Sequence, residues 1–367
     1  MITFIILTRN NPTYLRDCIN NLLQQTKKNW NAIIIDTSND DNQFKNRALC
    51  YPHKDKINYW PFCIELGFAA KNNMGIEEAL KNKDCEFVCL LNDDAYPNKY
   101  FIEDIISHAK KYKDYSAFSP LYVYNDTKVQ VVGGGYFSED APCGEKQICH
   151  DVNPTKMSDK ELLEFWDIIS IPKQIDCGYG AAIVYRTSLF EKIGYLDPVF
   201  KHGFDEPDFA KRMKLKGEKI LYLPTTVTHI CGGSSKNRSF FKNLHIILPM
   251  NRGYLYFLMK HYPAEFVIKT ELKKLKKSIK HPKGFLLEVY SILWNMVGAN
   301  ETRGNYHELY DPKDEFKTEI IGGVEKKIKI KQTRVPFKLR LCEFLLTYSF
   351  AICLLIVPCI LYILGVR

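Results

Sequence analysis

Apolar runs alternate with helix-like spacing along the first part of the chain. Short uninterrupted apolar runs at 2–7, 30–35 and 87–91 are typical of strands that are buried on both faces. Between them, apolar residues recur every three or four positions, as in the segment that follows Pro12. Repeated strand and helix segments of this kind predict a doubly wound α/β domain with a parallel sheet.

Polar side chains come directly after two of these runs. Asp36 follows the second run, and Asn92, Asp93 and Asp94 follow the third. The carboxyl ends of parallel strands meet at one edge of a sheet, where adjacent carboxylates can hold a hard divalent cation. Asn and Asp are also common in ordinary turns, and Pro97 follows here. On these residues alone, both interpretations stay open.

A segment of small residues at 67–75 is a second candidate for ligand contact. Gly67 and the alanines after it would let the backbone approach a ligand closely, and the amino end of the following helix favours negative charge. Tight packing of a helix on the sheet would explain the same glycines equally well.

From residue 115 onward the pattern changes to shorter strands. A helix is predicted near 159–166 within an otherwise irregular segment, and strands are predicted at 219–223 and 226–230. His229 lies near the end of the last of these strands. A lone His there more often satisfies a hydrogen bond than binds a metal.

A pair of adjacent acids marks the start of another predicted helix. Asp205 and Glu206 precede Pro207, which fits the first helical turn. Backbone amides and the helix dipole would keep a carboxylate there ionised, which is the state that a general base requires. Plain helix capping would explain the same residues.

The net charge of +9 is concentrated in two strips. Eight Lys and two Glu lie in 260–283, and seven Lys or Arg without an acid lie in 326–340. Basic strips of this kind can bind nucleic acid or anionic lipid. They lack interleaved aromatic residues, so we expect no nucleic acid partner. Twelve cysteines without a CxxC pair indicate reduced, mostly buried thiols rather than a zinc site.

The segment 344–366 contains 23 residues without a charge and is long enough to cross a bilayer. We interpret it as a transmembrane helix, and the basic strip before it indicates that residues 1–340 lie on the cytoplasmic side. No signal peptide is expected before the first strand. A helix at 269–280 has apolar residues on one face, so it either lies on anionic lipid as a membrane partner or is simply solvated.

In their order along the chain, these residues resemble the motifs of the family 2 glycosyltransferases of the GT-A fold, in particular the rhamnosyltransferase-like branch. The resemblance extends over 1–235 and implies the GT-A fold, a doubly wound α/β fold with a mixed sheet. Two positions depart from the family pattern, since Asn92 replaces the first Asp of the metal motif and Asp205-Glu206 reverses the usual order of the acid pair. The positions that carry the resemblance are Thr8, Asn10, Asp36, 67–75, 92–94, Gly180, Ala181, Arg186, 205–208, Arg212, Pro224, His229 and Ser234.

The resemblance implies an inverting transferase that moves a sugar from a UDP-, dTDP- or GDP-sugar to a hydroxyl of a saccharide or lipid-linked glycan. It implies Asp94 as a ligand of Mn²⁺ or Mg²⁺, with His229 as second protein ligand. It implies Glu206 as the general base, with Asp205 as the rival assignment. The implied donor-side residues are Thr8, Asn10, Asp36, Gly67, Asn72, Asn73 and Asp93, and the implied acceptor-side residues are Gly180 and Ala181.

Together these observations predict a membrane-attached enzyme for surface-glycan or glycoprotein assembly. Two alternatives stay open. A polyprenyl-phosphate sugar synthase of the same fold would transfer to a lipid phosphate and would need no hydroxyl base. An inactive GT-A scaffold would not bind a nucleotide with Mn²⁺. The predicted parts are a GT-A catalytic domain at 1–235, a helical basic extension at 236–325, a basic juxtamembrane segment at 326–340 and a transmembrane helix at 341–366.

Overall fold

The computed structural model divides into two compact units, Met1–Arg238 and Ser239–Arg367, which we treat separately. The boundaries predicted from the sequence at 235, 325 and 340 stay predictions. The residues that the structure describes are 1–63, 66–125, 128–139, 142–144, 146–147, 150–230, 244–304, 320–321 and 324–325.

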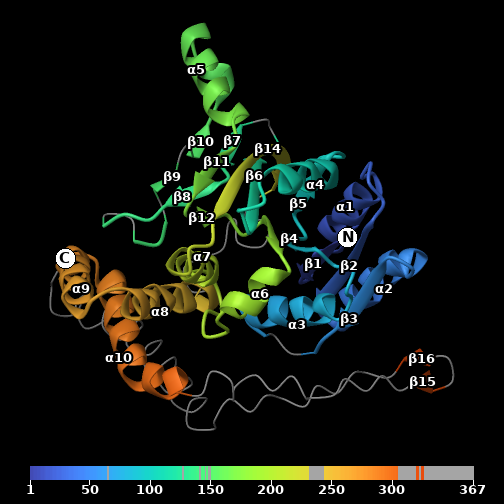
Figure 1. The fold of residues 1–367 in the computed structure, drawn as a ribbon. Coiled ribbons are helices and arrows are strands. Elements are labelled where there is room, and N and C mark those ends of the chain that lie inside the picture. The colour runs from blue at the N-terminus through green and yellow to red at the C-terminus, as the bar shows by residue number, and fades with distance from the viewer. Residues whose placement is uncertain are drawn as a thin grey trace. The chain divides into compact units, whose positions relative to one another are not determined.

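Four parallel strands form one half of the central sheet of the first unit (Figure 1). They are β1 (Ile2–Thr8), β2 (Trp30–Asp36), β3 (Ile57–Pro61) and β4 (Phe87–Asn92), in the spatial order β3-β2-β1-β4. The apolar runs at 2–7, 30–35 and 87–91 therefore correctly predicted β1, β2 and β4. In the register, Thr8 pairs with Asp36 and Leu7 pairs with Asn92, so the polar strand ends lie at one edge.

The other half of the sheet mixes strand directions. Strand β13 (Ala182–Arg186) runs antiparallel to β4, while β6 (Ala117–Val123) and β14 (Ile220–His229) run parallel to each other. The two strands predicted at 219–223 and 226–230 are one strand, whose pairing with β6 shifts register around Pro224. The outer strands of this sheet are β5 (Ala95–Pro97), β7 (Val129–Val132), β10 (His150–Val152) and β11 (Lys173–Ile175). A separate small sheet contains β8 (Gly134–Tyr136), β9 (Lys146–Gln147) and β12 (Cys177–Gly178).

Helices cover both faces of the parallel strands. Helices α1 (Pro12–Leu23) and α4 (Phe101–Lys111) share the apolar cluster of Phe4, and the rings of Phe4 and Phe101 lie 6.4 Å apart. Helix α3 (Phe68–Leu80) packs on the opposite face, where a Cβ on Gly75 would lie 2.6 Å from Ile5. Since Phe4 and Ile5 point to opposite faces of β1, tight helix packing explains the glycine at position 75.

The remaining helices of this unit are shorter or more exposed. Helix α5 (Asp159–Ser170) confirms the helix predicted near 159–166, begins with a capping box at Ser158 and projects away from the sheet (Figure 1). The described cysteines are free thiols, and six of the seven are buried, as predicted. The other helical segments are α2 (Asp40–Cys50), α6 (Ser188–Ile193), α7 (Asp205–Leu215) and two 3₁₀ turns at Tyr51–His53 and Pro154–Lys156.

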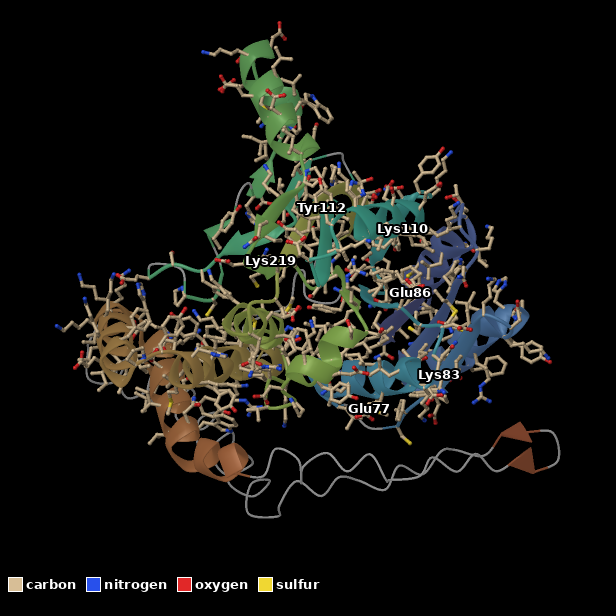
Figure 2. The ribbon with its side chains drawn as sticks, viewed as in Figure 1. Glu77, Lys83, Glu86, Lys110, Tyr112 and Lys219 are labelled. Carbon is tan, nitrogen blue, oxygen red and sulfur yellow. The ribbon has the colours of Figure 1, made fainter. Side chains whose placement is uncertain are left out.

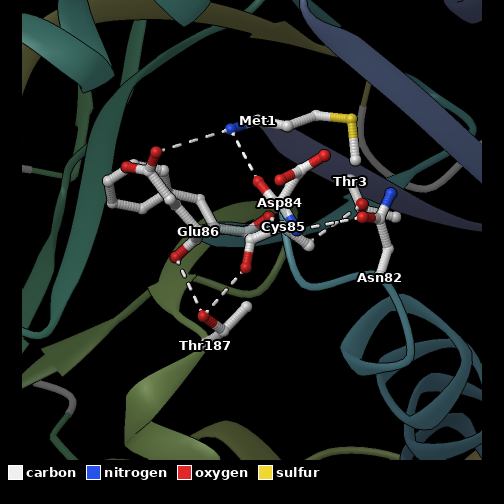
Figure 3. Close-up of polar contacts among 8 residues, drawn as sticks. Met1, Thr3, Asn82, Asp84, Cys85, Glu86 and Thr187 are labelled. Carbon is white, nitrogen blue, oxygen red and sulfur yellow. Dashed lines mark hydrogen bonds and ion pairs between the residues drawn. The ribbon is translucent and has the colours of Figure 1, made fainter.

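The amino edge of the sheet is tied together by structural hydrogen bonds (Figure 3). The amine of Met1 donates to the carbonyl of Asp84 at 3.0 Å, and the hydroxyl of Thr187 donates to the carbonyl of Cys85 at 3.0 Å. These bonds join the starts of β1 and β4 to the turn before α6. Charged side chains such as Lys83 and Lys110 are exposed around this scaffold (Figure 2).

The second unit is mainly helical. Helices α8 (Leu244–His261), α9 (Ala264–Ser278) and α10 (Pro282–Gly304) line a mainly apolar cavity of about 480 Å³. Ile268 and Leu272, at the lining of this open cavity, are exposed by 59% and 52%, and Ile279 is exposed by 65%. The unit also contains two short paired strands, β15 (Ile320–Ile321) and β16 (Val324–Glu325).

The predicted juxtamembrane segment at 326–340 and transmembrane helix at 341–366 lie outside the described residues. Within the part that is described, none of the helices combines the length and apolar character needed to span a membrane.

Candidate active site

The ends of β1 and β4 meet at Thr8 and Asp93. The hydroxyl of Thr8 donates to Oδ2 of Asp93 at 2.7 Å, and Thr8 is buried. Burial raises the pKa of Asp93 to about 7, although the bond from Thr8 opposes this rise. The two predicted donor-side residues therefore lie together, and the carboxyl group of Asp93 titrates near neutrality.

Asp94 and His229 meet although they lie far apart in the sequence. Strand β14 runs antiparallel to β5, so that His229 pairs with Ala95, the residue after Asp94. As a result, Nε2 of His229 lies 3.4 Å from Oδ1 of Asp94. The amide of Ile230 also donates to the carbonyl of Asp94 at 3.0 Å. The structure thus brings together the two residues predicted to bind a metal.

The separation of Asp94 and His229 fits shared coordination of one small divalent cation. Adjacent ligands about 2.1 Å from such an ion lie about 3 Å apart, close to the observed 3.4 Å. Across the described residues, His, Cys, Asp and Glu side chains do not gather in groups of three or more that could hold a metal. Two protein ligands would leave positions for phosphate oxygens and water, which is usual for Mg²⁺.

Asp36 is held inside the protein instead of being displayed at the edge. It is fully buried, and its oxygens accept from the Ser38 amide at 2.8 Å, from Asn46 at 2.8 Å and from the Tyr59 hydroxyl at 2.6 Å. Asn10 joins the loops after β1 and β2, because its backbone amide donates to the Ser38 hydroxyl at 2.7 Å. These hydrogen bonds shape the loop after β2, and contact of Asp36 with a nucleotide stays a prediction.

The segment after Gly67 is also engaged within the protein. A Cβ on Gly67 would lie 2.8 Å from Cα of Lys201. The side chain of Asn73 donates to the carbonyl of Leu196 at 2.8 Å and accepts from its amide at 3.0 Å, while Asn72 donates to Phe68. These contacts favour the packing explanation of the motif. The donor-side role of Gly67, Asn72 and Asn73 stays a prediction.

Lys71 is a site residue that the sequence reasoning did not single out. It is only 7% exposed, and its Nζ donates to the hydroxyl of Thr37 at 3.4 Å. Its charge is close enough to Asp93 to lower the pKa of that group in part, against the larger effect of burial. The sequence feature that could have indicated Lys71 is a Lys within 67–75, a segment of otherwise small, apolar and amide residues.

The acid pair begins helix α7, directly after Phe204, which has a φ of 66°. Asp205 is 1% exposed, and its carboxyl group lies against that of Glu206 and the backbone amide at the start of α7. Burial, followed by the neighbouring charge of Glu206, raises the pKa of Asp205 well above its usual value. Glu206 is partly exposed, and burial raises its pKa as well.

The prediction that backbone amides and the helix dipole keep these carboxylates ionised was therefore wrong. Backbone amides do lower the pKa of Asp205 and Glu206, but loss of hydration on burial outweighs them. Of the two acids, Glu206 is the less buried residue. This observation favours Glu206 over Asp205 as the base.

Gly180 and Ala181 link Glu206 to the end of β4. A Cβ on Gly180 would overlap Oε1 of Glu206 at 1.7 Å, so this glycine provides the space for the carboxylate. The carbonyl of Ala181 accepts from the amide of Asn92 at 2.9 Å. The predicted acceptor-side residues thus connect the acid of α7 with the strand that carries Asp94.

The two arginines of the motifs have structural partners. Arg212 binds Asp208 at 2.9 Å and donates to the carbonyls of Ile193 and Tyr195. Arg186 donates to the carbonyls of Ala109 and Tyr115. Ser234, the last residue of the resemblance, lies outside the described residues.

The family model for glycosyl transferase family 2 matches residues 3–194 of the chain. The chain belongs to this family. Its family 2 region contains the Thr8–Asp93 contact, Asp94 and Gly180, whereas Glu206 and His229 follow it in the same compact unit. The family assignment confirms the resemblance inferred from the motifs.

Curated proteins with similar sequences are also glycosyltransferases. An uncharacterised glycosyltransferase of Rickettsia typhi is 28% identical over 207 residues, which is 56% of each chain. The low-salt glycan biosynthesis hexosyltransferase Agl10 of Haloferax volcanii is 24% identical over 182 residues, 49% of this chain and 53% of Agl10. The similarity thus spans about half of the length of these relatives.

A solved structure shares the fold of this family 2 glycosyltransferase. GalNAc-T7 in complex with UDP, GalNAc and Mn²⁺ superposes with a TM-score of 0.52 at 14% sequence identity, covering 83% of this chain and 57% of GalNAc-T7. At this identity the similarity supports the GT-A fold alone. It confirms the mixed α/β sheet expected from the sequence.

Proposed function

We propose that this family 2 glycosyltransferase transfers a sugar from a nucleotide-diphosphate donor to a hydroxyl of a saccharide or lipid-linked glycan, with inversion at the anomeric carbon. The observation that supports this most is the meeting of Asp94 and His229 at 3.4 Å, next to Asp93 and the Thr8 hydroxyl. Such a cluster at the carboxyl ends of strands suits an anionic, metal-bound donor.

Asp94 and His229 would hold Mn²⁺ or Mg²⁺. A carboxylate and an imidazole suit Mn²⁺ at least as well as Mg²⁺. GalNAc-T7, which has the same fold, was crystallised with UDP and Mn²⁺. When bound, the ion supplies Lewis-acid stabilisation of the diphosphate leaving group.

The donor side would be completed by Thr8, Asp93 and Lys71. Asp93 has a pKa of about 7 and is held by the Thr8 hydroxyl, so it can contact either a ribose hydroxyl or the metal. Lys71 adds a buried positive charge close to these acids. That charge would offset part of the negative charge that the donor phosphates bring into the site.

Glu206 would remove the proton from the acceptor hydroxyl as its oxygen attacks the anomeric carbon. Its raised pKa makes it a stronger base than an ordinary Glu, provided that it is ionised before the acceptor binds. Gly180 leaves the space that this carboxylate occupies. A single displacement with a base on the face opposite the leaving group gives inversion, so no covalent intermediate is required.

The direct test is a panel of UDP-, dTDP- and GDP-sugars incubated with the full chain, with and without Mn²⁺. We expect metal-dependent hydrolysis or transfer with one nucleotide class, and loss of the metal dependence in Asp94→Asn. An inactive scaffold would show neither turnover nor Mn²⁺-dependent nucleotide binding by calorimetry, and that result would refute the proposal.

We also propose that α9 contacts anionic membrane lipid and that the enzyme works at the cytoplasmic face of a membrane. The apolar residues Ile268, Leu272 and Ile279 are more than half exposed. Five exposed lysines lie on or directly after the same helix, at positions 269, 273, 276, 277 and 280. An apolar stripe with lysines beside it is typical of a helix at a lipid interface.

A further inference from the structure

Gln130 is a buried polar residue in an otherwise apolar strand. It lies in β7, whose sequence is Val-Gln-Val-Val, and is 2% exposed. Its Oε1 lies 3.0 Å from Nδ1 of His229, and its Nε2 donates to the hydroxyl of Tyr179 at 3.3 Å. Both ends of the amide therefore have partners, and one partner is the imidazole of the candidate metal site.

These contacts favour one position for the proton of neutral His229. Because the NH₂ group of Gln130 is directed to Tyr179, its oxygen faces Nδ1, which must then donate. In the neutral ring, this leaves Nε2 with its lone pair, and Nε2 is the atom that lies 3.4 Å from Asp94. The ring therefore presents an unprotonated nitrogen on the side where Asp94 contributes an oxygen.

The surrounding aromatic rings hold this arrangement in place. The ring of Tyr179 meets His229 edge to face at 5.9 Å, and Tyr122 packs on Tyr179 at 5.0 Å. The hydroxyl of Tyr122 also donates to the carbonyl of Tyr179 at 2.6 Å. His229 itself is 5% exposed, so water cannot readily replace the bond from Gln130.

We propose that Gln130 is a positioning residue that keeps His229 in the tautomer and orientation required to bind a divalent cation. The inference rests on the proposed function, because it assumes that Asp94 and His229 share that cation. Residues that orient a metal-binding His in this way typically change metal affinity by about 10- to 100-fold when they are replaced. A buried pair that only satisfied its own hydrogen bonds would affect stability and leave metal affinity unchanged.

The test is the dissociation constant of Mn²⁺, measured with the full chain by calorimetry or by the electron paramagnetic resonance signal of free Mn²⁺. Gln130→Met keeps the size of the side chain but removes the acceptor, so we expect affinity to fall by about 10- to 100-fold. Gln130→Glu keeps an acceptor, and the Tyr179 hydroxyl can turn to donate to it. We expect this variant to bind Mn²⁺ within about threefold of the parent.

Tyr179→Phe provides a second test that leaves Gln130 itself unchanged. Without the hydroxyl, the amide loses the partner that orients it, and we expect a smaller fall in Mn²⁺ affinity. Nitrogen-15 spectra of histidine-labelled protein should show the His229 proton on Nδ1 in the parent and on Nε2 in part of the Gln130→Met population. Unchanged Mn²⁺ affinity in folded Gln130→Met, or in Tyr179→Phe if Gln130→Met does not fold, would overturn the proposal.

Asp94→Asn and His229→Ala separate this inference from the proposed function. If both abolish Mn²⁺ binding while the variants at Gln130 and Tyr179 bind normally, only the role of Gln130 is wrong. If neither changes Mn²⁺ binding, the proposed metal site itself is wrong, and the role of Gln130 fails with it.

Discussion

The carboxylate of Glu206 occupies the space that a Cβ on residue 180 would need, at 1.7 Å from Oε1. The glycine is therefore required by a side chain on a different element, α7, and not by the conformation of its own backbone. This relationship connects the acid pair to the strand that carries Asp94, and it leads to a direct test of Glu206 as the base.

Gly180→Ala should displace Glu206 and lower kcat by about 100-fold, because a shift of about 1 Å in a catalytic group has an effect of that size. The KM for the nucleotide-sugar should change little. Steady-state kinetics at saturating donor would measure both. Gly284→Ala is the matched control, since its Cβ would meet nothing closer than 3.7 Å. Normal kcat in Gly180→Ala would contradict the assigned position of the base.

Glu206→Gln should reduce transfer to a hydroxyl acceptor by about 10²- to 10⁴-fold, the usual contribution of a general base. Binding of Mn²⁺ and nucleotide should be retained, because Glu206 is not among the residues that would hold them. Glu191→Gln, an exposed acid on α6, is the control. Near-normal transfer by Glu206→Gln would instead favour a lipid phosphate acceptor, which needs no hydroxyl base.

Relative to the parent, Asp205→Asn should raise the free energy of unfolding by an amount that increases as the pH rises from about 4 to 7. Burial raises the pKa of Asp205, so in this range the folded state retains a proton that the unfolded state releases, and parent stability falls with pH. The amide does not titrate and avoids this loss, worth about 1.4 kcal/mol for each pKa unit. Denaturant unfolding of the parent and of Asp205→Asn at pH 4 and pH 7 would measure this difference in the free energy of unfolding. An equal difference at pH 4 and pH 7 would show that Asp205 is not protonated in the folded state.

Lys71→Met should weaken binding of the nucleotide-sugar by about tenfold, the size expected for one buried bond or contact to a charged group. The reason is the position of Lys71 beside Thr37 and close to Asp93. Calorimetry with the donor and Mn²⁺ would measure the change, and Lys83→Met, at an exposed position, is the control. Donor affinity within twofold of the parent would exclude Lys71 from the donor site.

Helix α9 should be protected from hydrogen exchange when the full chain is placed in nanodiscs that contain phosphatidylserine, but not in nanodiscs of phosphatidylcholine alone. Each Lys near an anionic surface contributes about 1 kcal/mol, so replacing Lys269, Lys273, Lys276 and Lys280 by Gln should remove the protection. Helix α5 also exposes Leu163 and Trp166 but is acidic, and it should not respond. Equal protection in both lipids would argue against electrostatic contact.

The parallel half of the sheet could be predicted because a strand buried on both faces is apolar along its whole length. The strand around Pro224 was predicted as two strands, since proline cannot donate to a sheet. In the structure β14 continues through this position by shifting its register against β6. Local propensity was therefore overridden by pairing with a neighbouring strand.

The candidate site was predicted in part. Asp94 and His229 were paired through the family resemblance, and the structure places them 3.4 Å apart. The engagement of Asp36 and Asn73 within the protein could not be predicted, because their partners come from other segments. Gln130 was missed for the same reason, although a single polar residue in an apolar strand was a usable signal.

By itself, the sequence determined the family, the parallel strands and the order of the chemical groups along the chain. These follow from composition and spacing, which act over a few residues at a time. Only the tertiary structure decided which groups share a site and which are enclosed. The contacts among Gln130, His229 and Asp94 need β7, β6, β14 and β5 to pair side by side. The raised pKa of Asp205 needs the surrounding residues to exclude water.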